Sequence, residues 1–146
     1  GYIFQALCEG TSILFAVFAM SVIFSLIHLF NENMTSMSIL FLFIHGLLYA
    51  VIYLKTRSLW TAIGVHWSWN WFQGPIFGIN VSGSTITKSV FVTQTHGSEI
   101  ISGGDFGLEG SLLSCLVSLG IVVFVWRSSW LSPSKRMIDL WSHYPG

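Results

Sequence analysis

Long apolar stretches alternate with short polar breaks along this chain, which is the pattern of a helical membrane protein. A membrane-spanning helix needs about 20 apolar residues, and residues 11–30 form such a stretch with no Asp, Glu, Lys or Arg. We expect further helices over 37–54, from Ser58 to Gly74-Pro75, and over 111–126. Residues 1–8 are typical of the end of a helix, which Glu9 and Gly10 break. The pattern therefore predicts an all-α, multi-pass transmembrane bundle of about four spans plus the tail of a preceding helix.

The composition supports a membrane protein. Of the 146 residues, 53% are hydrophobic and only 8% are charged, whereas a soluble domain is about 25% charged. The formal net charge is zero, which gives no reason to expect nucleic-acid binding. Cys8 and Cys115 lie far apart in apolar surroundings, so we interpret them as small hydrophobic residues and not as a disulfide or a metal site.

The stretch 78–110 differs in kind from the rest of the chain. It is rich in Gly, Ser and Thr, and its charged residues exclude it from contact with the lipid core. We expect a surface loop, either a functional lid or a plain solvated connector. Within it, we expect His96 to be solvated, and Asp105 and Glu109 to have no catalytic duty, although they could line the mouth of a site.

Basic residues predict the orientation in the membrane. If four helices span, one side holds five basic residues, Lys55, Arg57, Arg127, Lys135 and Arg136, and the opposite side holds only Lys88. The positive-inside rule places the first side in the cytoplasm. The domain organisation that we expect is a membrane domain over 1–127 and a basic C-terminal tail over 128–146.

Polar side chains within the apolar stretches are the candidates for chemistry, because they are costly in hydrocarbon and mark functional sites. Phe24 and His28 are four residues apart, as are His66 and Asn70, so each pair shares one helix face. A histidine can bind a metal, act as a base or donate to an oxyanion, and an Asn one turn away can orient it. The alternatives are an interhelical hydrogen bond for His66 and an interfacial position for His28. His45 has no patterned partner, and we interpret it as structural.

The predicted helix from Ser58 carries two stripes at helical spacing. We expect the polar stripe to face other helices and the second stripe to face lipid or the membrane interface. The polar stripe consists of Ile63, His66, Asn70 and Gln73, and the second of Trp60, Gly64, Trp67 and Trp71.

Three motifs occur in a recognisable order. They are F-x-x-x-H at 24–28, S-L-W-T-A-I-G-V-H-x-x-x-N at 58–70 and the Gly-rich run 103–111. In this order they resemble the CPBP family of intramembrane proteases, which includes CAAX prenyl endopeptidases and Abi bacteriocin-immunity proteins. The resemblance covers residues 1–127. The family's first motif, E-E-x-x-x-R, is absent, and residues 1–7 look like the segment after its arginine, so we expect a C-terminal fragment of a longer protein.

This resemblance implies an intramembrane endopeptidase in a bacterial cell membrane, which cleaves membrane-associated peptide or protein substrates such as prenylated CAAX chains. It implies that His28, His66 and Asn70 are catalytic and that Phe24 supports them. In such enzymes a glutamate activates water, and the histidines and Asn stabilise the oxyanion or a divalent metal such as zinc. If a metal is used, His28 and His66 would be ligands. Glu9 is a poor substitute for the missing glutamates, so we expect the fragment alone to be inactive.

Two alternatives stay open. A non-proteolytic immunity or scaffold protein of the same fold would not need the glutamates, and a transporter fragment would use the histidines as a proton relay. A shared site also faces a geometric difficulty. At 1.5 Å per residue, His28 lies about 26 Å along its helix and His66 only about 12 Å along its own, so the helices must tilt or the first must begin outside the hydrocarbon.

Overall fold

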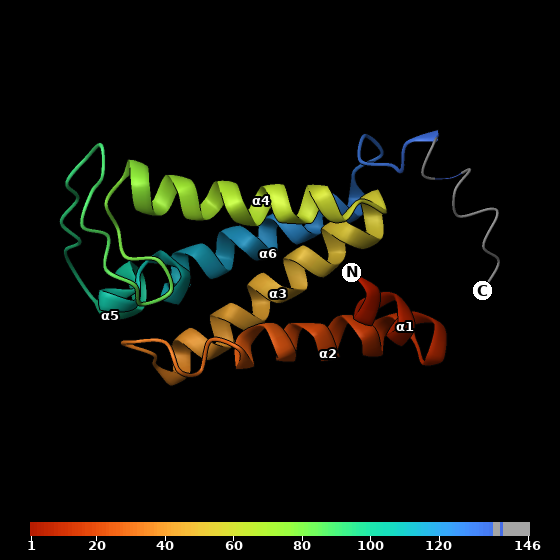
Figure 1. Cartoon of the computed structure of the whole chain (residues 1–146), viewed down its shortest axis with the longest axis horizontal. Helices are drawn as coiled ribbons and strands as arrows, with labels where there is room; N and C mark the ends of the chain where they lie inside the picture. The colour runs from red at the N-terminus through yellow and green to blue at the C-terminus, as the bar shows by residue number, and fades with distance from the viewer. Residues whose placement is uncertain (136–137, 139–146) are drawn as a thin grey trace.

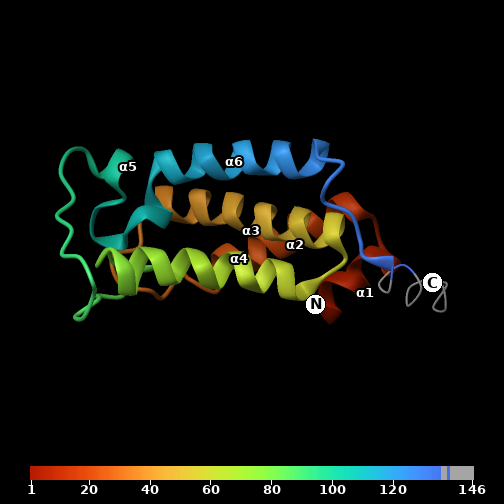
Figure 2. The ribbon, with the colours of Figure 1, turned by 90° about the horizontal axis from the view of Figure 1, so that it is seen from above.

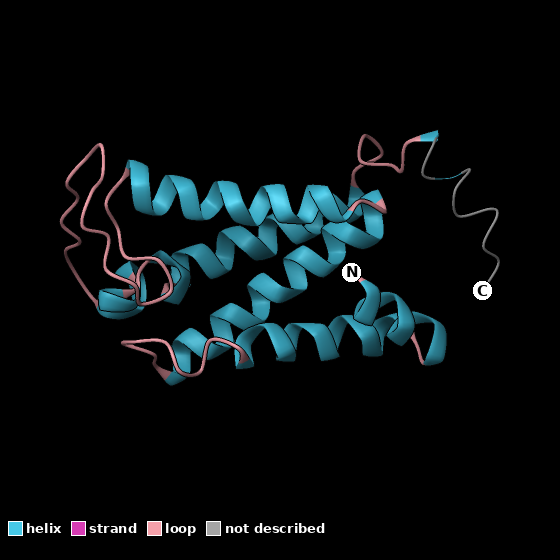
Figure 3. Ribbon diagram, viewed as in Figure 1, coloured by secondary structure: helices cyan, strands magenta, loops and turns pink. Residues whose placement is uncertain are grey.

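Helix α3 (Ser36–Thr56) is the centre of the fold, as Figures 1 and 2 show. The structure is a computed structural model and describes residues 1–135 and 138. Helices α2 (Ile13–Leu26), α4 (Leu59–Trp71) and α6 (Leu112–Arg127) pack on α3, and α1 (Tyr2–Gly10) packs on α2. A short helix α5 (Glu99–Ser102) lies in the loop before α6. The described part of the chain contains no strand (Figure 3), so the predicted all-α class is confirmed.

Hydroxyl side chains cap three of the long helices. The side-chain oxygens of Ser12, Thr35 and Ser111 accept hydrogen bonds from backbone N–H groups three residues further on, over 3.2, 3.0 and 3.1 Å. Such caps satisfy N–H groups that the first turn of a helix leaves without partners. Ser58 is the N-cap residue of α4, as predicted, but its side chain makes no capping hydrogen bond.

Small side chains allow α2 to lie close against α3. A Cβ atom at Gly46 of α3 would lie only 2.8 Å from the Cα atom of Ser21 in α2. The buried Ser21 hydroxyl is satisfied within its own helix, because it donates to the carbonyl oxygen of Val17 at 2.8 Å. Large apolar side chains of α2 point outward instead, and Leu14 is 83% exposed. Small residues at a helix crossing and apolar residues on the outer surface are typical of helices that pack within lipid.

Among the described helices, only α3 is both long and apolar enough to cross a membrane. Helices α2 and α6 are apolar but have 14 and 16 residues, fewer than the about 20 that a span requires. The predicted multi-pass bundle is therefore not confirmed beyond its helical class and one candidate span. One reason is that the chain leaves the helix at Leu26 and forms turns over 27–30, although those residues continue the apolar pattern.

The basic ends of α3 and α6 lie at the same end of the bundle, as the sequence predicts. The Nζ of Lys55, near the end of α3, donates to the carbonyl oxygen of Trp126 in α6 at 3.1 Å. The end of α3 therefore lies beside the end of α6, while the loop that carries Lys88 lies at the opposite end of the bundle (Figure 1). Residues 136–137 and 139–146 of the expected basic tail lie outside the described residues, so the domain boundary after Arg127 stays a prediction.

Candidate active site

His28 lies in a turn just beyond α2, not inside the predicted helix. Its Nδ1 is 2.7 Å from the carbonyl oxygen of Phe24, and the rings of the two residues lie 4.9 Å apart. A carbonyl oxygen can only accept, so Nδ1 carries a hydrogen and donates it, which leaves Nε2 available for other contacts. Phe24 therefore fixes the orientation of His28 through its backbone and through its ring.

His66 and Asn70 lie on successive turns of α4. The Nδ2 of Asn70 donates a long hydrogen bond, 3.4 Å, to Nε2 of His66. Since Nε2 is the acceptor, the hydrogen of a neutral His66 ring is on Nδ1. The Oδ1 of Asn70 is buried and has no hydrogen-bond partner among the described residues. This arrangement allows Asn70 to orient His66 while keeping one acceptor for another group.

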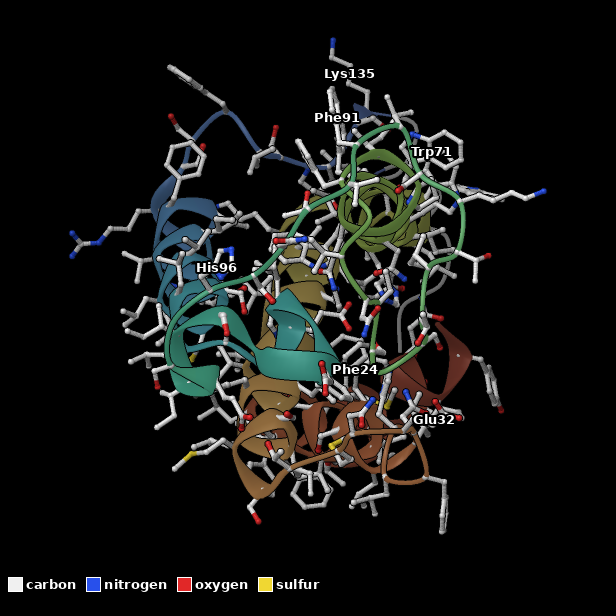
Figure 4. All side chains as sticks on the ribbon, turned by 90° about the vertical axis from the view of Figure 1, so that its left-hand side faces the viewer. Phe24, Glu32, Trp71, Phe91, His96 and Lys135 are labelled. Atoms are coloured by element: carbon white, nitrogen blue, oxygen red, sulfur yellow. The ribbon has the colours of Figure 1, made fainter. Side chains whose placement is uncertain are left out.

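The structure brings the two histidines together across one phenylalanine. The ring centroid of Phe24 lies 5.6 Å from that of His66, in addition to its contact with His28. Tyr49 of α3 completes this ring cluster, with its centroid 4.9 Å from His66 and 5.4 Å from Phe24. Figure 4 shows Phe24 inside the bundle, between α2 and α4. The different distances of the two histidines along their helices therefore do not separate them, because the aromatic side chains bridge the helices.

Most of the polar stripe that begins in α4 faces inward, and the tryptophans of the second stripe, Trp60, Trp67 and Trp71, face outward, as predicted. Gln73 is 3% exposed, whereas Trp60 is 81% exposed, and Trp71 lies on the outer side of α4 in Figure 4. Ile63 is an exception, because it is 45% exposed. The α-helix ends at Trp71 and the chain continues as the π-helix η1 (Phe72–Ile76), so the helical segment ends near Gly74-Pro75, as predicted. The wider turn of a π-helix accommodates Pro75, which has no N–H to donate.

The loop between α4 and α6 is docked onto the bundle at both of its ends. The side-chain amide of Gln73 donates to the carbonyl oxygen of Asn80, and Nδ2 of Asn80 donates to that of Asp105 at 2.9 Å. Asn31, in the turns after α2, donates to the carbonyl oxygen of Ser82 at 2.9 Å. Residues 91–101 between the docked ends are exposed. The loop is thus neither a plain solvated connector nor fully packed.

Glu109 is a neighbour of the site that the sequence analysis did not select. It lies in the 3-10 turn η3 (Leu108–Gly110), is 3% exposed and accepts a hydrogen bond from the hydroxyl of Ser82. Burial raises the pKa of its carboxyl group, and the Ser82 hydrogen bond and the nearby His28 oppose that shift. The only signal for it in the sequence was the Gly-rich run 103–111, from which we expected a loop residue that has no catalytic duty but could line the mouth of a site.

The other candidates lie outside the ring cluster. His45 is buried in α3, where its Nδ1 donates to the carbonyl oxygen of Phe41 at 2.8 Å and its Nε2 is buried without a hydrogen-bond partner among the described residues, so its structural role stays a prediction. Glu9 is exposed in the last turn of α1. Cys8 and Cys115 are both free, as expected, and Cys115 is buried.

The described side chains do not form a complete metal site. Within residues 1–135 and 138, no group of three or more His, Cys, Asp and Glu residues is placed to hold a metal ion. A catalytic zinc site needs about three protein ligands, and the ring cluster supplies only the imidazoles of His28 and His66. The Nε2 of His66 is moreover already an acceptor for Asn70. The residues present therefore do not fit zinc by themselves.

Comparison with known families identifies the class of protein to which this arrangement corresponds. Residues 1–72 match the Rce1-like family model, described as type II CAAX prenyl endopeptidase Rce1-like. This segment contains Phe24, His28, His66 and Asn70, and over it the resemblance to intramembrane proteases of the CPBP family is confirmed. No curated protein and no solved structure matches the chain. Residues 1–72, just under half of the chain, are therefore similar to type II CAAX prenyl endopeptidases of the Rce1-like kind.

Proposed function

We propose that this chain is part of a multi-pass intramembrane endopeptidase that cleaves a peptide bond in membrane-associated substrates such as prenylated CAAX chains. The observation that carries the proposal is the contact of the Phe24 ring with both His28 and His66. These residues come from two separate elements, and both lie in the segment that matches the Rce1-like family. The outward-facing apolar side chains and the long apolar helix α3 support a site within the membrane.

The chemistry of the two imidazoles suits stabilisation of an oxyanion. Peptide hydrolysis needs a base that takes a proton from water, and hydrogen-bond donors for the carbonyl oxygen as it becomes negative. His66 has an N–H on Nδ1 that is not used by Asn70, and His28 can donate from Nε2 when its ring is protonated. We assign the base to a glutamate of the family's E-E-x-x-x-R motif, which does not occur in this sequence.

An apolar cavity beside the ring cluster suits the lipid part of a substrate. Its volume is about 200 Å³, and its lining includes Met20, Ile23, Phe24, Tyr49, Tyr53 and Ala62. Phe24 and Tyr49 line this cavity and also contact His66. A lipid chain held in the cavity would therefore keep an attached peptide close to the histidines, and such positioning accelerates a reaction.

Hydrolysis of a farnesylated CAAX peptide by the complete protein that contains this chain tests the proposal. His28→Ala or His66→Ala should lower the rate about 10²–10³-fold, the usual cost of losing an oxyanion donor, without reducing membrane expression. Asn70→Ala should cost less, because Asn70 acts through His66. His96→Ala is the matched control, since His96 is exposed in the loop, and it should be fully active. Full activity in both the His28 and the His66 variants would refute the assignment.

A further inference from the structure

Tyr49 is a member of the ring cluster that carries a polar group of its own. It lies on α3 and is partly buried, and its ring packs against His66 at an interplanar angle of 33° and against Phe24 at 68°. Phe24 and Tyr49 are the two aromatic side chains in ring contact with His66 within the described residues. Phe24 has no polar atom in its side chain. Of these two residues, only Tyr49 can therefore donate a hydrogen bond, through its hydroxyl group.

No hydrogen bond of the Tyr49 hydroxyl group occurs within the described part of the chain, and this group is not one of the fully buried polar atoms without a partner. A hydroxyl group that is accessible in this way on a ring packed against His66 is available to a ligand. The hydroxyl also lies close enough to Glu109 for the two groups to interact electrostatically, and Glu109 is similarly close to His28. The hydroxyl end of Tyr49 therefore belongs to the polar part of the site.

The ring and the hydroxyl of Tyr49 thus face two different environments. The ring lines the apolar cavity, next to Phe24. The hydroxyl is within electrostatic range of the buried carboxyl group of Glu109. A substrate with its apolar chain in the cavity would place its peptide group at the boundary between these environments, where the hydroxyl lies.

We propose that Tyr49 is a further catalytic residue, whose hydroxyl donates a hydrogen bond to the carbonyl oxygen of the scissile peptide bond. This proposal rests on the proteolytic function proposed above. When water adds to the carbonyl carbon, the π electrons of the C=O bond move onto the oxygen, and a donor there stabilises the negative charge. The proton stays on the phenol oxygen throughout. When the intermediate collapses, the C–N bond breaks and the amine leaves.

Tyr49→Phe tests the proposal, because it removes the hydroxyl and keeps the ring that packs on His66. Tyr2→Phe is the matched control. Tyr2 lies on α1, is 84% exposed and is not part of the cavity lining. In the complete protein, Tyr49→Phe should lower kcat for a farnesylated CAAX peptide about 10²-fold and leave KM within about twofold, whereas Tyr2→Phe should change neither. A kcat of Tyr49→Phe within about twofold of the wild-type value would overturn the proposal.

Inhibition by a farnesylated peptide phosphonate gives a second measurement. Its tetrahedral oxygens imitate the oxyanion, so Tyr49→Phe should weaken its binding by about the same factor as it lowers kcat/KM. Unchanged phosphonate binding would exclude the hydroxyl as a donor. His66→Ala separates the two proposals. If the wild type is active and His66→Ala is not, the proteolytic function stands and Tyr49→Phe decides the role of Tyr49. If the wild type is inactive, both proposals fail.

Discussion

Gly46 offers a direct test of how the packing of α2 on α3 positions the ring cluster. A Cβ atom at this position would lie 2.8 Å from the Cα atom of Ser21, 3.1 Å from the Cβ atom of Phe24 and 3.2 Å from the carbonyl oxygen of Ser21. Ordinary contact begins at 3.4 Å, so the shortest of these distances must open by about 0.6 Å in Gly46→Ala. The opposing atoms are mainly backbone atoms, which cannot move aside by a side-chain rotation. Helix α2 must therefore shift away from α3.

The shift should reduce both stability and activity. Overpacking of this kind costs about 1–3 kcal/mol of unfolding free energy. Phe24 moves with α2, and Phe24 contacts both His28 and His66. Because a misplacement of about 1 Å can cost about 10²-fold in rate, a shift of about 0.6 Å should lower peptide hydrolysis about tenfold or more.

Two other glycines in helices provide matched controls for Gly46→Ala. A Cβ atom at Gly64 in α4 or at Gly120 in α6 would meet nothing within 4 Å. Gly64→Ala and Gly120→Ala should leave hydrolysis unchanged and increase helix stability by about 0.5–1 kcal/mol. Unfolding by denaturing detergent in mixed micelles measures stability, and cleavage of the farnesylated peptide measures activity. If Gly46→Ala were as stable and as active as Gly120→Ala, the reasoning from the α2–α3 contact would be wrong.

Three further predictions concern orientation, the chain by itself and pH. Cysteines introduced at Ser58 and Ser134 should react with a membrane-impermeant maleimide from the cytoplasmic side and one at Ser84 from the other side, and the reverse pattern would overturn the charge-based orientation. Residues 1–146 expressed alone should insert into membranes but not cleave a prenylated CAAX peptide, and cleavage that depends on the histidines would show that the E-E-x-x-x-R glutamates are dispensable. Because burial raises the pKa of Glu109, the folded state holds its proton more tightly than the unfolded state, and stability should fall as pH rises from the ordinary carboxyl pKa through the raised one. Glu109→Gln should remove this fall in the unfolding midpoint, and an identical pH dependence in the variant would contradict the interpretation.

The helices could be predicted because their signals in the sequence are local. The same holds for the two pairs with a spacing of four residues, Phe24/His28 and His66/Asn70. An apolar run and a spacing of four residues report the faces of a helix directly. The same local pattern failed where a turn is as apolar as a helix. Ile27, Leu29 and Phe30 continue the apolar run of α2, yet the helix ends at Leu26. The apolar pattern therefore overestimated the length of this helix, and with it the number of spans that the structure supports.

Tyr49 could not be selected from the sequence because its significance depends on contacts between distant segments. In the apolar run of α3 it resembles any other aromatic residue, and only its packing on His66, 17 positions later in the sequence, distinguishes it. Glu109 presents the same difficulty, since its burial depends on a hydrogen bond from Ser82, 27 residues earlier. Periodicity within one helix contains no information on such partners.

The composition of the run 103–111 explains why Glu109 was expected in a surface loop and also why it is buried. Gly107 has a positive φ of 98°, and a Cβ atom there would lie 1.9 Å from the carbonyl oxygen of Asn80 and 2.8 Å from Nε2 of Gln73. Only glycine allows the backbone to approach the docked end of the loop so closely. The glycines that are typical of a flexible, solvated loop therefore serve here to bring the following turn, and with it Glu109, against Ser82. Any larger residue at Gly107 should displace that turn and expose the carboxyl group.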